Sequence, residues 1–456
     1  METENIVKKN DKKSLNLFFR IFLPITLVIA VVIPLWSIND LFLGLLLLVY
    51  FILILSFLHN KWGLFLFLLL RPALDFSTKE VILQMGSFDL NFASILGVCV
   101  VVFALWIFIK NYKELKKQPL FILWILFIAI NIISLLFSIN ITSGIAEVTR
   151  LGTILSFFIL GFILIRENKD FSRLIKVIIL SSLIPSVIAF FQIINDTGLK
   201  DGINSRVFGT FAHPNMLAFY LCLSIVLTIF IFLNNNRKQL SSLLYGLLML
   251  FQFILLIFTY TRGAWLVLFI FIVLIGIIHF RKFLIASFAF LLVFYLILTP
   301  FQERINSLVN LDPYGSITWR FELWRDAYQD IKKEPVIGHG SGTSSLVIAK
   351  NRGYMMGSTA PHNDYVRVAL NTGFMGLASY LLLLAILLLT LLKLYRKQDK
   401  PKLKMFNLFI LSFSLALFAM SAGDNVLNDT SLQWSFWALI GALIALQINS
   451  KKLITS

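Results

Sequence analysis

The feature that most constrains this sequence is a series of long apolar runs, each near the roughly 20 residues that a helix needs to cross a bilayer. Fourteen such runs divide the 456 residues, with approximate bounds of 17–36, 41–57, 62–74, 92–110, 119–137, 145–165, 173–193, 215–233, 242–260, 263–279, 282–299, 366–394, 405–421 and 431–447. Runs of this length predict helices, because membrane β-strands have about 10 residues of alternating polarity. The third run is short, so 41–74 forms either two spans or one re-entrant hairpin.

Composition indicates that the whole chain lies in a membrane. Hydrophobic residues make up 59% of the sequence and charged residues only 14%, whereas a soluble domain carries about 25% charged residues. This composition excludes two or three soluble domains, because their water-facing surface would need many more charged residues. We predict an all-α, polytopic membrane bundle of about 12–14 transmembrane helices, with residues 1–456 forming a single transmembrane domain.

The net charge of +17 predicts how the bundle is oriented. If the N-terminus is cytoplasmic and the runs alternate, the basic clusters at 110–117, 166–173 and 393–404 all fall inside. The outside segments are then close to neutral, as the positive-inside rule requires. We therefore expect a multi-pass protein of the cell membrane with both termini in the cytoplasm. The charge reflects topology and not nucleic-acid binding.

Residues 300–364 form the longest connection on the outer face. Within it, segment 316–331 has an apolar residue at every fourth position, namely Trp319, Leu323, Ala327 and Ile331. Pro335 follows this segment. This spacing predicts a short amphipathic helix, lying at the membrane interface or against the bundle. Long loops of this kind are often functional, so we expect this extracytoplasmic loop to cover the site.

Several polar residues cluster at the outer ends of the spans, where the predicted topology presents helix N-termini. They are Arg150, Arg206, His213, Asn215, Arg262, His362, Asn363 and Asp364. A helix N-terminus carries about half a positive charge, and the planar arginine fork matches phosphate oxygens. The sequence therefore predicts a phosphate-binding pocket. The same dipole favours a neutral histidine, so His362 is a candidate base at the rim.

Each of these residues also has a structural explanation. Arg262 could extend toward lipid head groups, and Glu147 and Arg150 could pair as i,i+3 neighbours. Asn363 and Asp364 could be helix caps. These alternatives stay open at the level of sequence.

A glycine-rich segment, Gly338-His-Gly-Ser-Gly342, contains His339. It lacks the Lys-Ser/Thr of a nucleotide-binding loop, so its glycines are better explained by loop freedom. The sequence also has no HExxH or CxxC pattern. We expect no metal, no cofactor and no ATP-driven transport.

Three segments carry a family resemblance: Arg206-x-x-Gly209-Thr-Phe-x-His213-Pro-Asn215, Thr261-Arg-Gly-Ala-Trp265 and Pro361-His-Asn-Asp-Tyr365. In this order and spacing they resemble the O-antigen ligase and Wzy-type polymerase family, over residues 200–395. Leu70-Arg-Pro72 is a weaker match nearer the N-terminus. Members of that family are polytopic glycosyltransferases of the outer face of the cytoplasmic membrane. They move a glycan from an undecaprenyl-pyrophosphate donor to a sugar hydroxyl without a metal.

The resemblance implies a role for each residue. Arg206 and Arg262 would bind the donor pyrophosphate, and His362 would be the general base. From its position at the outer end of a span, Arg150 is a further candidate for the pyrophosphate, and we expect inversion at the sugar carbon. Supporting roles would fall to His213, Asn215, Asn363, Asp364 and His339. The implied partners are the lipid-linked donor, a glycan or glycolipid acceptor and the bilayer, with other polysaccharide-export proteins as further candidates.

Rival functions share some of these features. A flippase or transporter of lipid-linked oligosaccharides would spread its cations along a central cavity and not at one face. A peptidoglycan glycosyltransferase of the shape, elongation and division type would rely on an acidic residue. A protein O-oligosaccharyltransferase shares the C-terminal motifs and stays open. Polymerase versus ligase also stays open, because they differ in which acceptor fits.

Overall fold

The computed structural model of the chain describes residues 59–78, 83–85, 88–201, 204–235, 240–279, 316–352 and 359–455, with Ser56 and isolated residues between 281 and 302. The predicted spans at 17–36, 41–57 and 282–299 lie almost entirely outside the described residues. The question of two spans or a hairpin at 41–74 lies there too.

The described residues form α-helices joined by short connections and two β-hairpins. The helices are α3 (Asn60–Ala73), α4 (Phe92–Leu115), α5 (Pro119–Ser134), α6 (Ile141–Leu164), α7 (Asn168–Ser181), α8 (Leu183–Ile194), α9 (Pro214–Asn234), α10 (Leu240–Phe258), α11 (Arg262–Ile278), α14 (Ser316–Lys333), α15 (Ser344–Arg352), α16 (Asp364–Lys397), α17 (Pro401–Met420) and α18 (Thr430–Thr455). Short 3-10 turns are η2 (Asp75–Thr78), η3 (Leu135–Phe137) and η4 (Val426–Asn428). The antiparallel hairpins are β1 (Leu83–Met85) with β2 (Phe88–Leu90), and β3 (Leu199–Asp201) with β4 (Asn204–Arg206).

The helices confirm the predicted fold class. Among the described residues nine helices are long and apolar enough to cross a membrane, with α7 and α8 counted as one, and α11 is a shorter apolar helix. Their bounds follow the apolar runs within a few residues; the run at 215–233, for example, corresponds to α9. The protein is an all-α, multi-pass membrane bundle, and its two hairpins lie in connections.

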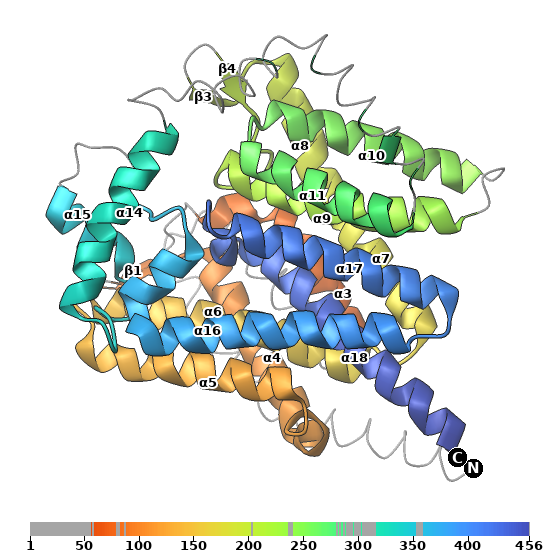
Figure 1. Cartoon of the computed structure of the whole chain (residues 1–456), viewed down its shortest axis with the longest axis horizontal. Helices are drawn as coiled ribbons and strands as arrows, with labels where there is room; N and C mark the ends of the chain where they lie inside the picture. Colours follow the sequence, from red (N-terminus) through yellow and green to blue (C-terminus); the bar gives the residue numbers. More distant parts are fainter. Residues whose placement is uncertain are drawn as a thin grey trace, which may run out of the picture.

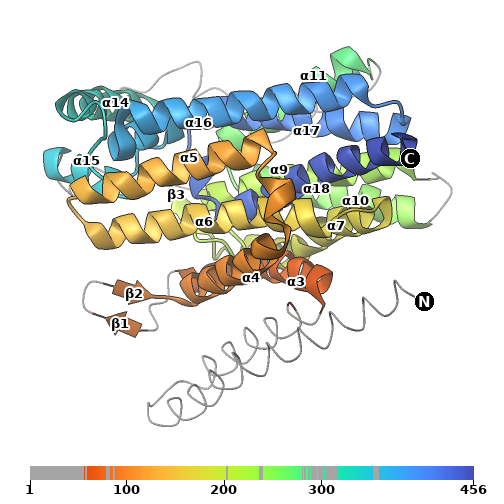
Figure 2. The same ribbon diagram turned by 90° about the horizontal axis from the view of Figure 1, so that it is seen from below.

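The spans run roughly side by side along the longest axis of the molecule (Figures 1 and 2). In Figure 1, α14 and α15 lie at the left end of the bundle, and the connection between α16 and α17 lies at the right end. Helices α9 and α18 are the most deeply buried spans, with α6 next. The two ends of the bundle are therefore distinct, with the long loop at one of them.

Glycine allows the central helices α6 and α18 to approach closely. A Cβ atom at Gly161 would lie 2.2 Å from the carbonyl oxygen of Ala438, and one at Gly441 would lie 2.3 Å from that of Phe158. Small residues at such contacts let helix backbones pack tightly in a membrane, where burial of apolar surface alone does not bring helices together. This contact fixes α18, and with it the connection that precedes it.

The long loop is joined to α16 at a kink. Gly373 has a φ of 61° inside α16, a backbone conformation that favours glycine. The next residue, Phe374, donates its backbone N–H to the carbonyl oxygen of Pro335 at 2.7 Å. The loop therefore replaces part of the helix's own hydrogen bonding and is held beside the first turns of α16.

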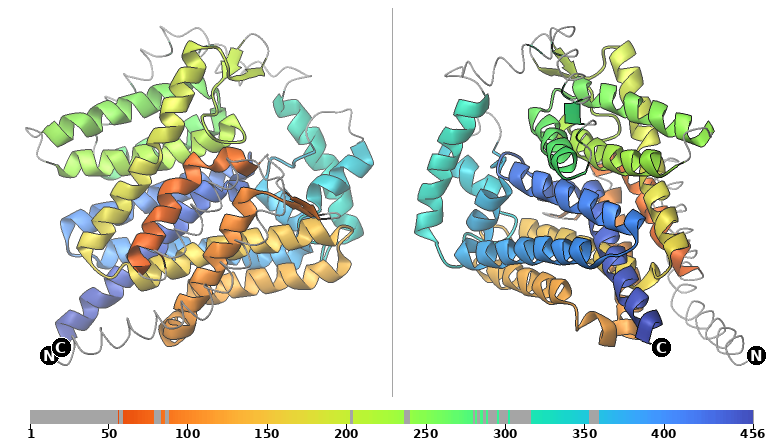
Figure 3. Two further views of the ribbon diagram at one scale, coloured as in Figure 1. Left: turned by 180° about the vertical axis from the view of Figure 1, so that it is seen from behind. Right: turned by 45° about the vertical axis from the view of Figure 1, so that its right-hand side comes forward.

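The predicted amphipathic helix is α14, and it packs against the bundle. The apolar face of this helix is buried, and Leu323, Ala327 and Ile331 form one hydrophobic cluster with residues of α15 and α16. Trp319 packs against the same cluster. Figure 3 shows α14 lying across the end of the bundle. Of the two predicted placements, the structure therefore has the contact with the bundle.

Candidate active site

The candidate site lies where four connections meet at the end of the bundle that carries α14. These connections are the segment before α9, the α10–α11 turn, the start of α16 and the α17–α18 segment. The backbone N–H of Asp364 donates to the carbonyl oxygen of Ser421 at 2.8 Å, which joins the start of α16 to the end of α17. Residues far apart in the sequence are therefore brought together here.

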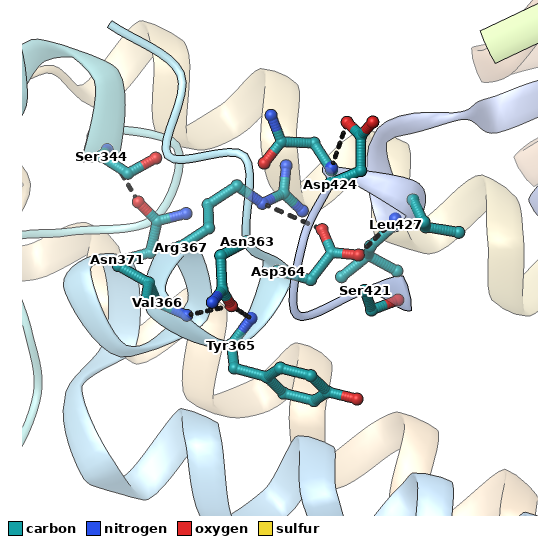
Figure 4. A network of polar contacts seen from close by, with 12 residues as sticks. Ser344, Asn363, Asp364, Tyr365, Val366, Arg367, Asn371, Ser421, Asp424 and Leu427 are labelled. Atoms are coloured by element: carbon teal, nitrogen blue, oxygen red, sulfur yellow. Dashed lines mark hydrogen bonds and ion pairs between the residues drawn. The ribbon is translucent and has the colours of Figure 1, made fainter. Parts of the chain in front are cut away.

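His362 directly precedes the N-terminal cap of α16. The cap is Asn363, whose Oδ1 accepts hydrogen bonds from the backbone of Tyr365 at 2.9 Å and Val366 at 3.1 Å (Figure 4). Asn363 is therefore a helix cap, as its structural explanation predicted.

His362 has a φ of 49°, which is uncommon for a residue with a side chain and is often found at functional sites.

Helix α14 supports the segment around His362. The indole nitrogen of Trp324 donates to the carbonyl oxygen of Pro361 at 2.8 Å. The ring of Trp319 lies edge-on to the His362 ring, with 6.1 Å between ring centroids. The long loop thus forms one wall of the site.

Asp424 faces the His362 ring from the α17–α18 segment. Its Oδ1 lies 3.7 Å from Nδ1 of His362, and both side chains are mostly buried. Arg320 of α14 donates to the carbonyl oxygen of Gly423 at 2.5 Å, beside this carboxylate. Burial raises the pKa of Asp424, but His362 and Arg320 outweigh burial and hold this pKa below its ordinary value. Asp424 is therefore a carboxylate at neutral pH.

Arg206 donates hydrogen bonds to α9 and to the connection between α10 and α11. Its Nη2 donates to Oδ1 of Asn215 at 2.8 Å and to Oγ1 of Thr261 at 3.2 Å. Its Nε donates to the carbonyl oxygen of Thr259 at 2.9 Å. Arg206 is the last residue of strand β4, so it lies before α9 and not in the first turn of that helix.

Asn215 links Arg206 to the carboxylate. Its Nδ2 donates to Oδ2 of Asp424 at 2.5 Å, across 209 positions of sequence. The contacts therefore run without interruption from Arg206 through Asn215 and Asp424 to His362, and we call these four residues the polar chain. His213 supports the chain by capping α9, because its Nδ1 accepts from the backbone N–H of Asn215 at 3.2 Å.

Arg262 lies beside the polar chain. It is the first residue of α11 and directly follows Thr261, which accepts a hydrogen bond from Arg206. Its side chain is partly exposed. The N-terminus of α11 and two arginines thus come to one edge of the site.

Arg150 belongs to a second, buried charge network. Its Nε and Nη2 donate to Glu147 at 2.9 and 2.6 Å, and its Nη1 donates to the carbonyl oxygen of Leu427. The backbone N–H of Leu427 in turn donates to Asp364 at 2.8 Å (Figure 4). Buried Arg367 lies 3.5 Å from Glu147 and 3.8 Å from Asp364. The predicted i,i+3 pair is present, and it extends to the segment before α18.

His339 ties the long loop to its neighbours. Its Nε2 lies 2.9 Å from the carbonyl oxygen of Asp330, and its backbone N–H donates to that of Leu370 at 2.8 Å. Neither contact involves a member of the polar chain. In the described part of the chain, no three His, Cys, Asp or Glu side chains are grouped as around a metal ion.

Two residues of the site were not singled out from the sequence. Asp424 lies between the runs at 405–421 and 431–447, and its position on the outer face was the available signal. Arg367 is a charged residue inside the run at 366–394, a position that is usually functional or paired.

Comparison with known protein families matches part of this chain. Residues 246–381 match the family model described as O-Antigen ligase, a range that includes Arg262, His362 and the described part of the long loop. A search of curated proteins gives no match. The bundle and the match define a multi-pass membrane protein of polysaccharide biosynthesis, a glycosyltransferase of the ligase or polymerase type. Residues 246–381 are thus similar to the O-antigen ligase family, which confirms the predicted resemblance over this part of the chain.

Proposed function

We propose that this protein transfers glycan units from an undecaprenyl-pyrophosphate-linked donor to an acceptor sugar hydroxyl, as a cell-surface polysaccharide polymerase or ligase. The observation that carries the proposal is the polar chain, which connects a guanidinium group to a histidine through a carboxylate. The reaction needs both ends of this chain: a cation for the leaving pyrophosphate and a base for the attacking hydroxyl. Its placement on the outer face rests on the charge asymmetry of the sequence.

His362 acts as the general base in this proposal. With Nδ1 turned toward Asp424, the carboxylate favours the tautomer that carries its proton on Nδ1. The Nε2 lone pair can then accept the proton of the acceptor hydroxyl. The distance of 3.7 Å is longer than a hydrogen bond, and such contacts often shorten when substrate binds.

Arg206 and Arg262 bind the donor pyrophosphate. Arg206 donates to Asn215, to Thr261 and to the carbonyl oxygen of Thr259, and these contacts hold its guanidinium at the site. Arg262 adds a second guanidinium at a helix N-terminus, a combination that favours phosphate. These two cations supply the charge stabilisation that a metal ion would give, so we propose a metal-independent reaction.

The transfer is a single displacement. The acceptor oxygen attacks the donor sugar C1 as its proton moves to Nε2 of His362, and the bond from C1 to the pyrophosphate oxygen breaks. The products are the extended glycan and undecaprenyl pyrophosphate, and the configuration at C1 inverts. General-base assistance contributes about 10²–10⁴-fold to such a reaction, and stabilisation of the departing anion adds to it.

Arg150 has a positioning role in this proposal and does not contact the donor. Its Nε, Nη1 and Nη2 all donate to Glu147 or Leu427. Through Leu427 it positions Asp364, and Asn363 holds the first turn of α16 behind His362. We assign these residues to the support of the base.

The test uses the purified full-length protein in lipid nanodiscs with undecaprenyl-pyrophosphate-linked repeat units. Chain growth without another acceptor indicates a polymerase, and transfer only to an added glycolipid indicates a ligase. His362→Ala should abolish transfer, while His279→Ala, at the opposite end of α11, should retain it. Transfer that disappears with a chelator would contradict metal independence, and near-normal turnover by His362→Ala would contradict the base.

A further inference from the structure

A second cavity lies at the end of the bundle opposite to His362. It has a volume of about 450 Å³ and is lined by residues of α7, α9 and α17 and of the short segments at their ends. Helix α9 begins beside Asn215 and ends at the cavity, and α17 begins at the cavity and ends just before Asp424. Helices of 21 and 20 residues rise about 30 Å, which is the thickness of a bilayer core. The cavity therefore lies at the membrane interface opposite to the candidate site.

The floor of this cavity is aromatic and already formed. The ring of Phe406 lies edge-on to Phe171 at 5.0 Å and to Phe230 at 4.7 Å between ring centroids. All three side chains are buried and line the cavity. Such packing holds the rings in place and offers an apolar surface to a ligand.

The rim of the cavity is basic. Three exposed lysines line it, Lys176, Lys400 and Lys402, and its described lining includes no Asp or Glu. The nearby carboxylate of Asp170 is paired with Lys61 and with Arg173. Helices α7 and α17 both begin here, and neither N-cap side chain bonds to its helix, so the helix dipoles add positive potential.

We propose that this cavity binds a phospholipid with an anionic head group. The phosphate lies among the three lysines, and the upper part of an acyl chain lies on the phenylalanine floor. Basic pockets between helices at this depth suit anionic lipids, and the cavity has the size of a small-ligand site. A free phosphate ion would make no use of the apolar floor. The charge asymmetry of the sequence assigns this end to the cytoplasm, the leaflet rich in anionic lipids.

Equilibrium binding of phosphatidylglycerol to the full-length protein in detergent, followed by native mass spectrometry, tests this proposal. Phosphatidylcholine with the same acyl chains should bind much more weakly. Each lysine contributes roughly fivefold to attraction of an anionic lipid, so replacing all three by Gln should weaken binding about a hundredfold. The matched control is the triple variant of Lys169, Lys393 and Lys397 to Gln, which removes equal charge from exposed positions outside the cavity lining.

A second variant separates the cavity from general surface charge. Ser172 lines the cavity, and Ser172→Trp should fill it and reduce lipid binding while leaving the three lysines in place. Equal loss in the control triple variant, unchanged binding by Ser172→Trp, or complete competition by millimolar inorganic phosphate would each overturn the proposal. The assay contains no glycan donor, so its result is independent of the proposed transferase reaction.

Discussion

The carboxylate Oδ1 of Asp424 lies 3.7 Å from Nδ1 of His362, although the two residues belong to different connections of the bundle. Asp424 lies between α17 and α18, and His362 precedes α16. Asp424 also accepts from Asn215, the partner of Arg206. One carboxylate therefore touches the proposed base and connects it to the proposed anion site.

Asp424→Asn should slow transfer by about 10–10² fold, because the amide keeps the shape of the side chain but no longer favours the Nδ1–H tautomer of His362. The loss should appear in kcat, with the KM for the donor little changed, and the pH–rate profile should shift. Steady-state transfer assays across pH measure both. The control is Asp399→Asn, because Asp399 is exposed and lies just after the C-terminal end of α16, away from His362. An unchanged pH–rate profile would show that Asp424 does not position His362.

Arg206→Lys should raise the KM for the donor by about tenfold or more. Lysine keeps the positive charge but cannot reproduce the fork that donates to Asn215, Thr261 and Thr259. Donor titrations measure the effect. Arg396→Lys, at the opposite end of the bundle, should match the unmodified protein. If the lysine variant binds the donor normally, charge alone explains the contribution of Arg206.

Gly161→Ala should destabilise the bundle by about 1–3 kcal/mol, because the added Cβ would lie 2.2 Å from the carbonyl oxygen of Ala438 on α18. Thermal unfolding in detergent, followed by tryptophan fluorescence, measures the change. Gly152→Ala lies on the same helix, and its Cβ would meet only Val101 at 3.8 Å, an ordinary contact. A similar melting temperature for both variants would contradict the close approach of α6 and α18.

Asp429→Asn should increase stability near neutral pH and reduce its dependence on pH. Burial, followed by the nearby carboxylate of Asp75, raises the pKa of Asp429 well above the ordinary value of 3.8. The folded protein therefore keeps a proton that the unfolded chain loses, so stability is present below pH 3.8 and decreases as the pH rises toward the folded pKa.

Melting temperatures measured from acid to neutral pH test this expectation. The unmodified protein should lose stability relative to Asp429→Asn as the pH rises. Asp196→Asn, on an exposed loop, should not show this pattern, because the hydrogen bond from Lys200 lowers the pKa of Asp196. A variant that is less stable at every pH would show that the Asp429 carboxylate is ionised and paired.

The spans within the described residues could be predicted from the sequence with little error. The run at 215–233 became Pro214–Asn234, and the pattern at 316–331 became Ser316–Lys333. In a bilayer a span must satisfy its own backbone hydrogen bonds, so local hydropathy is enough to locate it. The cap at Asn363 and the pair of Glu147 with Arg150 are equally local, since their partners are two or three residues away.

The partners of the charged residues could not be predicted in the same way. Arg150 was expected to bind the donor pyrophosphate, but its Nη1 donates to Leu427, 277 positions away. Arg206 was placed in the connection before the run at 215–233, but the hairpin that contains it was not predicted, because its short strands carry no apolar periodicity. Such contacts depend on how the helices pack, which hydropathy does not encode.

The sequence by itself determined that this chain crosses a membrane repeatedly, and it indicated the polar residues at one face. Both follow from single segments, because the length of an apolar run and the free-energy cost of burying a polar side chain in lipid do not depend on the other helices. Only the tertiary structure decided which of these polar groups meet. The Asn215–Asp424 hydrogen bond joins residues 209 positions apart. It forms where α9 packs against α17 and where the start of α16 is hydrogen-bonded to the end of α17.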